Sequence, residues 1–231
     1  MGAITNLKLL TKQILAPIYF RGYPITLKPE RLYLWMDILC HTLDTEGDII
    51  EVGVMHGGTS IIAKKLLVGL GSQKRYYAYD TFSGFVQEQV SGEIGKGLHP
   101  QFRNHFQANS EQLVKKIFRL HGVADIKTMK GDIMTQCHFP TTISAALLDV
   151  DLAEPTYAAL GKVYGRLSDG GVIAIDDCHR LRKGFEGYRA AEGVQRFADE
   201  RGISVEYAQG MGFISKGNAY KNAYINALKG G

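Results

Sequence analysis

The stretch DIIEVGVMHGGTS, residues 48–60, decides the fold class of this chain, because a strand-like run leads through glycines directly into a helical pattern. Residues 48–54 form a short and largely apolar run, which is typical of a buried strand. Glycines after such a strand let the backbone approach a ligand, and the N-terminus of the following helix offers free N–H groups. The residues that we expect at this ligand site are Glu51, Gly53, Gly57, Thr59 and Ser60.

The sequence beyond this stretch continues as an alternation of strand-like runs and helical patterns. Such alternation predicts a Rossmann-like α/β fold, a mostly parallel sheet with helices on both faces. Only Gln209 and Gly210 join the last two strand-like runs, too few residues for a crossover, so the sheet should end in an antiparallel hairpin. The seven expected strands are 48–54, 75–80, 126–132, 145–151, 170–177, 203–208 and 211–217, and the expected helices among them are 59–70, 109–121, 155–167 and 188–201.

Two regions do not follow this alternation. Residues 1–46 carry helical patterns at 5–15 and 28–43, which predict an N-terminal helical cap on a single globular unit formed by residues 47–231. Residues 83–108 are polar, rich in glycine and without clear periodicity. A long loop inside a compact domain is usually functional or disordered, so we interpret this segment as an active-site lid.

The composition argues against several classes of protein. The net charge is +4, but the Lys and Arg residues are scattered, so no nucleic-acid partner is expected. No stretch reaches the ~18 consecutive apolar residues of a membrane span. The three cysteines are far apart and without CxxC spacing, which favours a reducing cytoplasm over disulfides or a zinc site. The apolar residues of the N-terminal helices exceed what a small cap buries, which predicts a homo-oligomer, in the simplest case a dimer.

Acidic residues at the ends of the second and third expected strands suit a nucleoside. Asp80 ends a strand where open α/β sheets bind ligands, and its carboxylate can accept hydrogen bonds from two ribose hydroxyls. Asp132 ends the next strand and suits the exocyclic amine of adenine. The glycines lack the GxGxxG spacing of nicotinamide sites, and Glu51 would repel a pyrophosphate but favour a cationic amino-acid group. The candidates at these two strand ends are Asp80, Thr81, Phe82, Gly131 and Asp132.

The fourth and fifth expected strands each end in two carboxylates, Asp149 and Asp151 on one and Asp176 and Asp177 on the other. Neighbouring parallel strands bring such ends together. Converging carboxylates repel each other unless they are protonated or bridged by a cation. Ligands that are all oxygen select a hard ion such as Mg²⁺ or Ca²⁺. Solvated helix caps are the alternative interpretation of these aspartates.

Four strings, EVGVMHGGTS, YDTF, LDVDLAEPT and LSDGGVIAIDD, make the region from Asp48 to Ile203 resemble the macrocin O-methyltransferase (TylF) family. These are metal-dependent enzymes that methylate sugar hydroxyls of natural products and other glycosides. The resemblance implies a class I methyltransferase fold that binds S-adenosylmethionine with the glycine loop and Asp80. The Mg²⁺ ligands that it implies are Asp149, Asp176 and Asp177, with Asp149 also beside the cofactor. Cys178 and Ala153 stand where the family often has an aromatic residue, so the resemblance does not extend to the identity of the acceptor.

The expected chemistry is the transfer of a methyl group to the hydroxyl of a small-molecule acceptor. Coordination to a divalent cation lowers the pKa of a hydroxyl and fixes its oxygen in line with the methyl group. A nearby base then takes the proton, and His99 and His179 can titrate near neutrality. The catalytic candidates are therefore His99, His179 and Asp149. The cationic residues that could meet an anionic group on the acceptor are Arg180, Arg182 and Lys183.

Three other interpretations remain open at this point. The same carboxylates would bind the vicinal hydroxyls of a catechol-like phenol, so the acceptor class is undecided. A non-catalytic relative could keep the fold and bind the cofactor, although the intact acidic residues argue against decay. A nicotinamide dehydrogenase is disfavoured by the glycine spacing.

Overall fold

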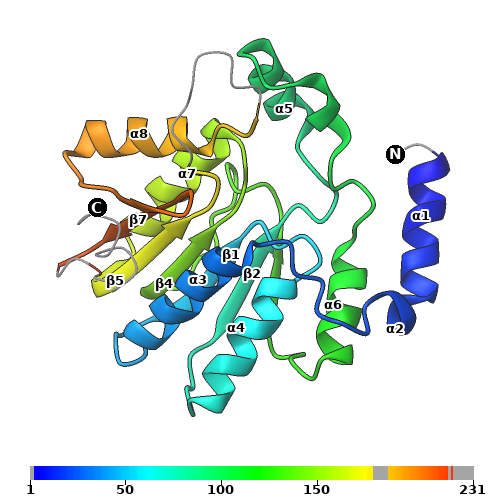
Figure 1. Cartoon of the computed structure of the whole chain (residues 1–231), viewed down its shortest axis with the longest axis horizontal. Helices are drawn as coiled ribbons and strands as arrows, with labels where there is room; N and C mark the ends of the chain where they lie inside the picture. The colour runs from blue at the N-terminus through cyan, green and yellow to red at the C-terminus, as the bar shows by residue number, and fades with distance from the viewer. Residues whose placement is uncertain (1–2, 179–186, 218–219, 221–231) are drawn as a thin grey trace.

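The protein is built on one seven-stranded sheet, seen in a computed structural model that describes residues 3–178, 187–217 and 220. The strands are β1 Asp48–Val52, β2 Tyr76–Asp80, β3 Lys127–Lys130, β4 Ile143–Leu148, β5 Leu167–Ile175, β6 Glu206–Ala208 and β7 Met211–Ser215. Their order is β3-β2-β1-β4-β5-β7-β6 (Figure 1). The first five strands are parallel, and β7 runs antiparallel to both β5 and β6. The predicted Rossmann-like sheet and its terminal hairpin are confirmed.

Helices cover both faces of this sheet. The helices of the described residues are α1 Ala3–Ile14, α2 Ala16–Tyr19, α3 Pro29–His41, α4 Gly58–Gly69, α5 Gln87–Gly95, α6 Glu111–Leu120, α7 Ala153–Tyr164 and α8 Ala190–Arg201, with a 3₁₀ turn at Pro100–Asn104. Apolar residues of α3, α4 and α6 pack over one face, and those of α7 and α8 pack over the other (Figure 1). The functional residues must therefore lie at the strand ends, because both faces are occupied by core.

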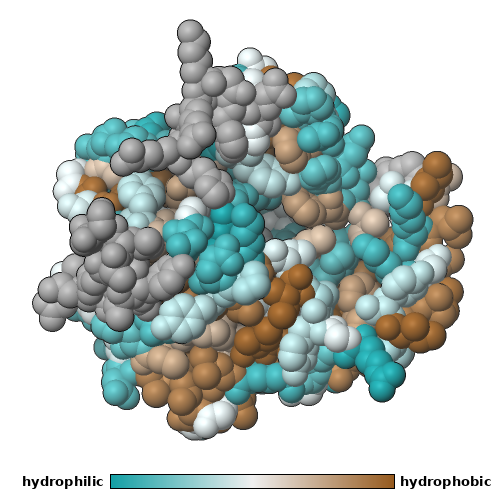
Figure 2. All heavy atoms as spheres, in the orientation of Figure 1, coloured by the Kyte–Doolittle hydropathy of each residue, from teal (hydrophilic) through white to brown (hydrophobic). Residues whose placement is uncertain are grey.

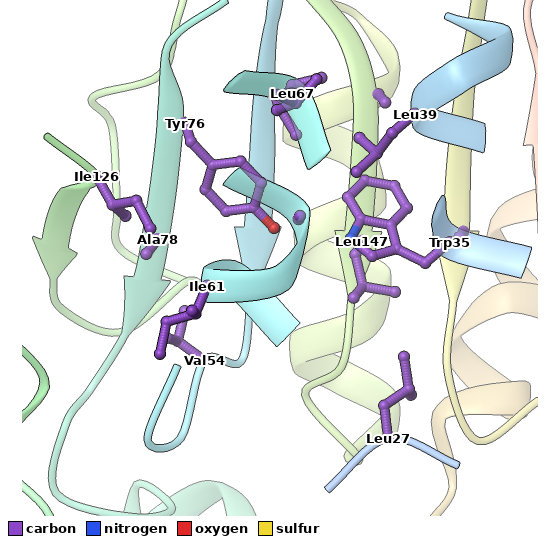
Figure 3. Packing of buried hydrophobic residues seen from close by; sticks show 14 of the residues in the cluster. Leu27, Trp35, Leu39, Val54, Ile61, Leu67, Tyr76, Ala78, Ile126 and Leu147 are labelled. Atoms are coloured by element: carbon purple, nitrogen blue, oxygen red, sulfur yellow. The ribbon is translucent and has the colours of Figure 1, made fainter. Parts of the chain in front are cut away.

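The face beneath α3 and α4 holds the largest core side chains. Figure 3 shows Trp35 of α3 and Ile61 of α4 beside Tyr76 and Leu147 of the strands, and all four are almost completely buried. All six residues of β4 are buried, as expected for a parallel strand covered on both faces. α3, which was expected in the N-terminal cap, thus contributes to the same core as the sheet.

The segment 83–108, expected as an irregular loop, contains the helix α5. Val90 and Leu98 are buried here against Leu152, with Phe85 and Tyr188 packed around them. The helix was missed because few of its positions are apolar, so its buried face gives only a faint 3.6-residue period. α5 stands over the carboxyl ends of the strands (Figure 1), the position that a lid would need.

α1 stands apart from the sheet at the edge of the molecule and buries none of its residues (Figure 1). Polar bonds attach it: the Lys12 ammonium donates to the carbonyl of Ala108 at 3.0 Å, and the Lys116 ammonium donates to the carbonyl of Gln13 at 2.6 Å. Apolar side chains gather on the surface there (Figure 2), namely Ile4, Leu7, Leu10 and Ile14. None of the helices in the described residues has the length and apolar character that crossing a membrane requires.

Candidate functional site

A cleft of about 310 Å³ opens at the carboxyl ends of β1, β2, β4 and β5. It lies where the strand order reverses, since β1 pairs with β2 on one side and with β4 on the other. Ligands of open α/β sheets bind at such switch points. The predicted site residues that line it are Gly53, Asp80, Thr81, Gly131, Asp132, Asp149, Asp176 and Asp177.

The glycine loop carries the backbone from β1 to α4 along the wall of this cleft. Gly53 has φ +90°, and a Cβ atom there would lie 1.7 Å from the carbonyl oxygen of Asp149. Gly57 has φ +80°, and a Cβ atom there would meet the ring of Phe118 at 2.3 Å. The absence of a side chain is thus explained at Gly53 by the close approach of the Asp149 backbone and at Gly57 by packing of the loop against α6, and of the two glycines only Gly53 lines the cleft.

Glu51 is turned away from the cleft and into the core. Its Oε2 atom accepts hydrogen bonds from the Ser60 hydroxyl at 2.5 Å and from the Tyr76 hydroxyl at 2.7 Å. Burial raises the pKa of Glu51 to about 7, against the effect of these two bonds. Ser60 and Thr59 are buried in the first turn of α4, and the structure places neither beside the cleft. The described contacts of Glu51 join β1, β2 and α4.

Asp80 lines the cleft and also holds the glycine loop. Its Oδ2 atom accepts the backbone N–H groups of Val54 at 2.8 Å and Met55 at 2.9 Å, and its Oδ1 atom accepts that of Phe82 at 2.6 Å. Burial raises the pKa of Asp80, and these hydrogen bonds oppose that effect. Thr81 lines the cleft next to it, whereas the Phe82 side chain is buried in the core.

Asp132 lines the same half of the cleft, after β3, and is bonded to α5. Its Oδ2 atom accepts a hydrogen bond at 2.7 Å from the side-chain amide of Gln89 in α5, and its Oδ1 atom accepts the backbone N–H of Met134 at 2.9 Å. Gly131 beside it also lines the cleft. α5 is thus bonded to the predicted adenine end of the cleft.

The other half of the cleft holds the carboxylates that follow β4 and β5. Burial, and after it the charges of the neighbouring aspartates, raise the pKa of Asp149 and of Asp151 well above the ordinary value. Burial also raises the pKa of Asp176 to about 6. Asp151 and Asp177 have left-handed backbones, with φ +65° and +52°, a conformation that costs ordinary residues energy and occurs often at functional sites. We call Asp149, Asp151, Asp176 and Asp177 the carboxylate cluster.

Arg31 of α3 reaches into the carboxylate cluster, a contact that we did not predict. Its Nη1 atom donates to Asp176 Oδ1 at 2.6 Å and to Asp177 Oδ1 at 2.9 Å. The sequence did contain a signal, because Arg31 precedes Leu34 and Trp35 at helical spacing and so belongs to the apolar stripe of the helix. A cation on a buried stripe requires an anionic partner.

The donor chemistry of the carboxylate cluster fits a hard divalent cation. Several buried carboxylates supply oxygen atoms and raise each other's pKa, which is the environment that a bound cation relieves. In the described part of the chain, no three His, Cys, Asp or Glu side chains are arranged around a common point as metal ligands. Two of the aspartates instead turn an oxygen toward Arg31.

Of the two histidines predicted as bases, His99 is among the residues that the structure describes and His179 is not. His99 is exposed, lies outside the cleft lining, and accepts a hydrogen bond on Nδ1 from the backbone N–H of Gln101 at 3.2 Å. His179 lies outside the described residues, as does the predicted cationic cluster of Arg180, Arg182 and Lys183. A residue not predicted, Tyr188, lines the cleft, and its hydroxyl is 3.0 Å from Nδ1 of His105, which belongs to the segment 83–108.

Curated proteins that are similar to this chain are named as O-methyltransferases. The demethyldecarbamoylnovobiocin O-methyltransferase of Streptomyces niveus is 28% identical over 155 residues, which are 62% of this chain and 58% of that protein. The 8-demethyl-8-(2,3-dimethoxy-alpha-L-rhamnosyl)-tetracenomycin-C 4'-O-methyltransferase of Streptomyces olivaceus is 30% identical over 156 residues, which are 64% of this chain and 60% of that protein. The chain therefore spans about three fifths of the length of these curated relatives.

Solved structures agree with the fold. The O-methyltransferase NovP superposes with a TM-score of 0.69 at 17% identity, over 93% of this chain and 98% of that chain. The calicheamicin methyltransferase CalS11 gives 0.64 at 19% identity, over 93% and 92%. At such identities the likeness concerns the fold alone. The family described as Macrocin-O-methyltransferase (TylF) matches residues 37–206, most of the chain and every strand of the parallel part of the sheet. The chain belongs to the macrocin O-methyltransferase family.

Proposed function

We propose that the protein transfers a methyl group from S-adenosylmethionine to a sugar hydroxyl of a glycosylated natural product. The observation that carries this proposal is the division of one cleft into two halves. One half presents single carboxylates, Asp80 and Asp132, and the other presents the carboxylate cluster. A nucleoside fits the first half and a hydroxyl acceptor fits the second.

The cofactor is proposed to lie along β1, β2 and β3. Asp80 would face the ribose, Asp132 the adenine, and Gly53 the methionine part. Gly53 supports this arrangement because its backbone borders the cleft where a side chain would collide with Asp149. Asp80 supports it because its acceptor oxygens are already oriented by backbone N–H groups.

A divalent cation such as Mg²⁺ is proposed to be held by Asp149, Asp176 and Asp177. Bound there, it would supply Lewis-acid chemistry that lowers the pKa of the acceptor hydroxyl. In the reaction the hydroxyl oxygen attacks the methyl carbon, and the carbon–sulfur bond breaks with its electron pair going to sulfur. The products are the methyl ether and S-adenosylhomocysteine, and the hydroxyl proton must pass to a base.

Asp151 is proposed as the base that takes this proton. It lines the cleft between Asp149 and Leu152, and its carboxyl group interacts with that of Asp177. Its backbone is held in place because its carbonyl accepts the N–H of Arg189 at 2.9 Å. His99 lies outside the cleft lining and would need a movement of the lid to reach the acceptor.

The segment 83–108 is proposed to act as a lid, because a methyl-transfer site must exclude water and still release its product. Its α5 already contacts Asp132 through Gln89. Amide hydrogen exchange in this segment should slow when S-adenosylhomocysteine binds, and exchange that does not change would contradict the lid.

A homodimer is proposed to cover the exposed apolar side chains of α1, because such residues are otherwise left in water. Light scattering at micromolar concentration should give the mass of a dimer. A monomer at this concentration would contradict the proposal.

The acceptor class follows the relatives, whose names include a methyltransferase acting at the 4' position of a rhamnosyl tetracenomycin. The test is turnover with S-adenosylmethionine and Mg²⁺ on two panels, glycosylated natural products and catechols, read by mass spectrometry. Methylation of a glycoside but not of catechols supports the proposal. Methylation of catechols alone would assign the phenol activity instead, and binding of S-adenosylhomocysteine without any turnover would favour a non-catalytic relative.

A further inference from the structure

Arg31 of α3 extends its guanidinium group into the carboxylate cluster, and the proposed reaction assigns this residue no role. Arg31 lies in the first turn of α3, before the part of the chain that matches the family, and only 3% of it is exposed. Besides its bonds to the two aspartates, its Nε atom donates to the backbone carbonyl of Gln209 at 3.0 Å. The guanidinium group is therefore fixed between α3, the end of β5 and the β6–β7 turn.

The geometry of the contact is that of a cation shared by two carboxylates. One nitrogen atom, Nη1, lies 2.6 Å from Asp176 Oδ1 and 2.9 Å from Asp177 Oδ1. These two consecutive aspartates turn one oxygen each toward the same point, as they would toward a metal ion. The ion pair is also buried, since the exposed fractions of the Arg31 and Asp176 side chains are 4% and 8%.

A counter-cation at this point lowers the cost of folding the carboxylate cluster. Buried carboxylates that face each other are destabilising unless a positive charge or protons compensate them. Arg31 supplies one positive charge, and its ion pairs within the cluster are with two of the four carboxyl groups, so it compensates the cluster only in part. A divalent ion would compensate it further, but it would have to bind oxygens that Arg31 already uses.

We propose that Arg31 is a resident counter-cation that competes with the divalent cation for Asp176 and Asp177. This inference rests on the proposed metal site. Arg31 bridges the two aspartates, and metal binding requires that at least one of these bonds be released. Arg31 thereby sets the metal affinity of the site, because the apparent affinity is reduced by the fraction of molecules in the bridged state.

The test compares Arg31→Met with the parent protein by titration with Mn²⁺, read by calorimetry and by electron paramagnetic resonance, without an acceptor. Methionine keeps much of the length of the side chain and removes the charge and the donors. Lys28→Met is the matched control, because Lys28 lines the same cleft and its ammonium forms no ion pair with the aspartates within the described residues. Arg31→Met should bind Mn²⁺ on the order of tenfold more tightly, and Lys28→Met should differ from the parent less than twofold.

Thermal unfolding provides a second measurement. In a chelator, Arg31→Met should melt below the parent protein because the carboxylates lose their counter-charge, and saturating Mn²⁺ should remove most of this difference. Arg31→Lys keeps a charge but has a single nitrogen, which cannot serve Gln209 and both aspartates as the guanidinium does. It should bind Mn²⁺ with an affinity between those of the parent and Arg31→Met, and it can replace the latter if that variant does not fold.

Each outcome separates the two proposals. Tighter Mn²⁺ binding by Arg31→Met, even where the parent protein binds none, supports competition. If the parent protein binds Mn²⁺ and Arg31→Met binds it equally or more weakly, the metal site stands and the competition is wrong. If neither protein binds Mn²⁺, both the metal site and the inference are wrong.

Discussion

Asp80 and Asp149 occupy equivalent places at the carboxyl ends of β2 and β4, yet the protein treats the two carboxylates differently. Around Asp80, hydrogen bonds from the backbone oppose the effect of burial on the pKa. Around Asp149, burial and the charges of Asp176, Asp151 and Asp177 all raise the pKa. Backbone N–H groups thus stabilise the charged form of Asp80, whereas the carboxylates around Asp149 need a positive charge. The same residue type at the same kind of position can therefore serve a neutral ligand or a cation.

The largest effect is expected from Asp176→Asn. The variant should lower turnover by two or more orders of magnitude, because the acceptor hydroxyl loses both its orientation and its lowered pKa. The fold should remain, since the substitution also relieves repulsion among carboxylates. Turnover, circular dichroism and binding of S-adenosylhomocysteine check this together. Full turnover in Asp176→Asn would remove the carboxylate cluster from the mechanism.

Asp151→Asn tests the proposed base, which lies in the same half of the cleft as the proposed metal ligands. As the proposed base, Asp151 contributes proton transfer, so turnover should fall about a hundredfold or more. Binding of Mn²⁺ should change much less than it does in Asp176→Asn. A turnover number that keeps the parent value would show that the base is elsewhere, and a variant that loses Mn²⁺ as completely as Asp176→Asn would reassign Asp151 as a metal ligand.

Asp80→Asn perturbs the half of the cleft in which backbone N–H groups donate to the carboxylate. An amide cannot accept from Val54, Met55 and Phe82 as the carboxylate does, so the glycine loop and the cofactor site are both weakened. The affinity for S-adenosylhomocysteine should fall about tenfold to a hundredfold, the value of charged hydrogen bonds. Calorimetry measures the affinity for S-adenosylhomocysteine, and the affinity for Mn²⁺ is the control. Unchanged affinity for S-adenosylhomocysteine would show that the cofactor does not use Asp80.

Glu51 is a third carboxylate, within β1, which accepts hydrogen bonds from two hydroxyl groups, and its substitution should have the smallest effect. Burial raises its pKa from the ordinary 4.5 to about 7, so folding takes up a proton. The stabilising contribution of this proton is complete below pH 4.5 and is lost as the pH rises to about 7. Glu51→Gln removes the titration and keeps an acceptor oxygen for Ser60 and Tyr76.

The melting temperature of Glu51→Gln should therefore decline less than that of the parent protein between pH 5 and 8, by a few degrees. The matched control is Glu46→Gln, which replaces an exposed carboxylate. Parallel declines in all three proteins would show that Glu51 does not titrate in this range.

Local sequence signals predicted the sheet and the placement of most acidic residues. A buried parallel strand is recognisable because most of its positions are apolar, as in β4, where only Ser144 is polar. Asp149 directly follows β4, and Asp80 is the last residue of β2. Gly53 and Asp132 were likewise predicted to lie near the ligand, and both line the cleft. These predictions needed only the period of the pattern and the position of the strand ends.

The remaining residues could not be placed in this way, because their positions depend on packing between distant segments. Glu51 was expected at the ligand, but its side chain points to the hydroxyls of Ser60 and Tyr76 in the core. Arg31 meets residues about 145 positions away in sequence, and no local pattern identifies its partners. α5 is fixed by contacts with Leu152 and Tyr188 rather than by its own periodicity.

The contrast between the two halves of the cleft is tested most directly by a crossed titration. Three proteins are compared by calorimetry: the parent protein, Asp80→Asn and Asp176→Asn. Each is titrated with S-adenosylhomocysteine in the presence of a chelator and, in a separate experiment, with Mn²⁺ alone. We predict that the parent protein binds both ligands, that Asp80→Asn loses affinity for S-adenosylhomocysteine alone, and that Asp176→Asn loses Mn²⁺ alone. Two results would contradict this account. One is that S-adenosylhomocysteine binds only when the divalent cation is present, and the other is that Asp176→Asn binds Mn²⁺ as the parent protein does.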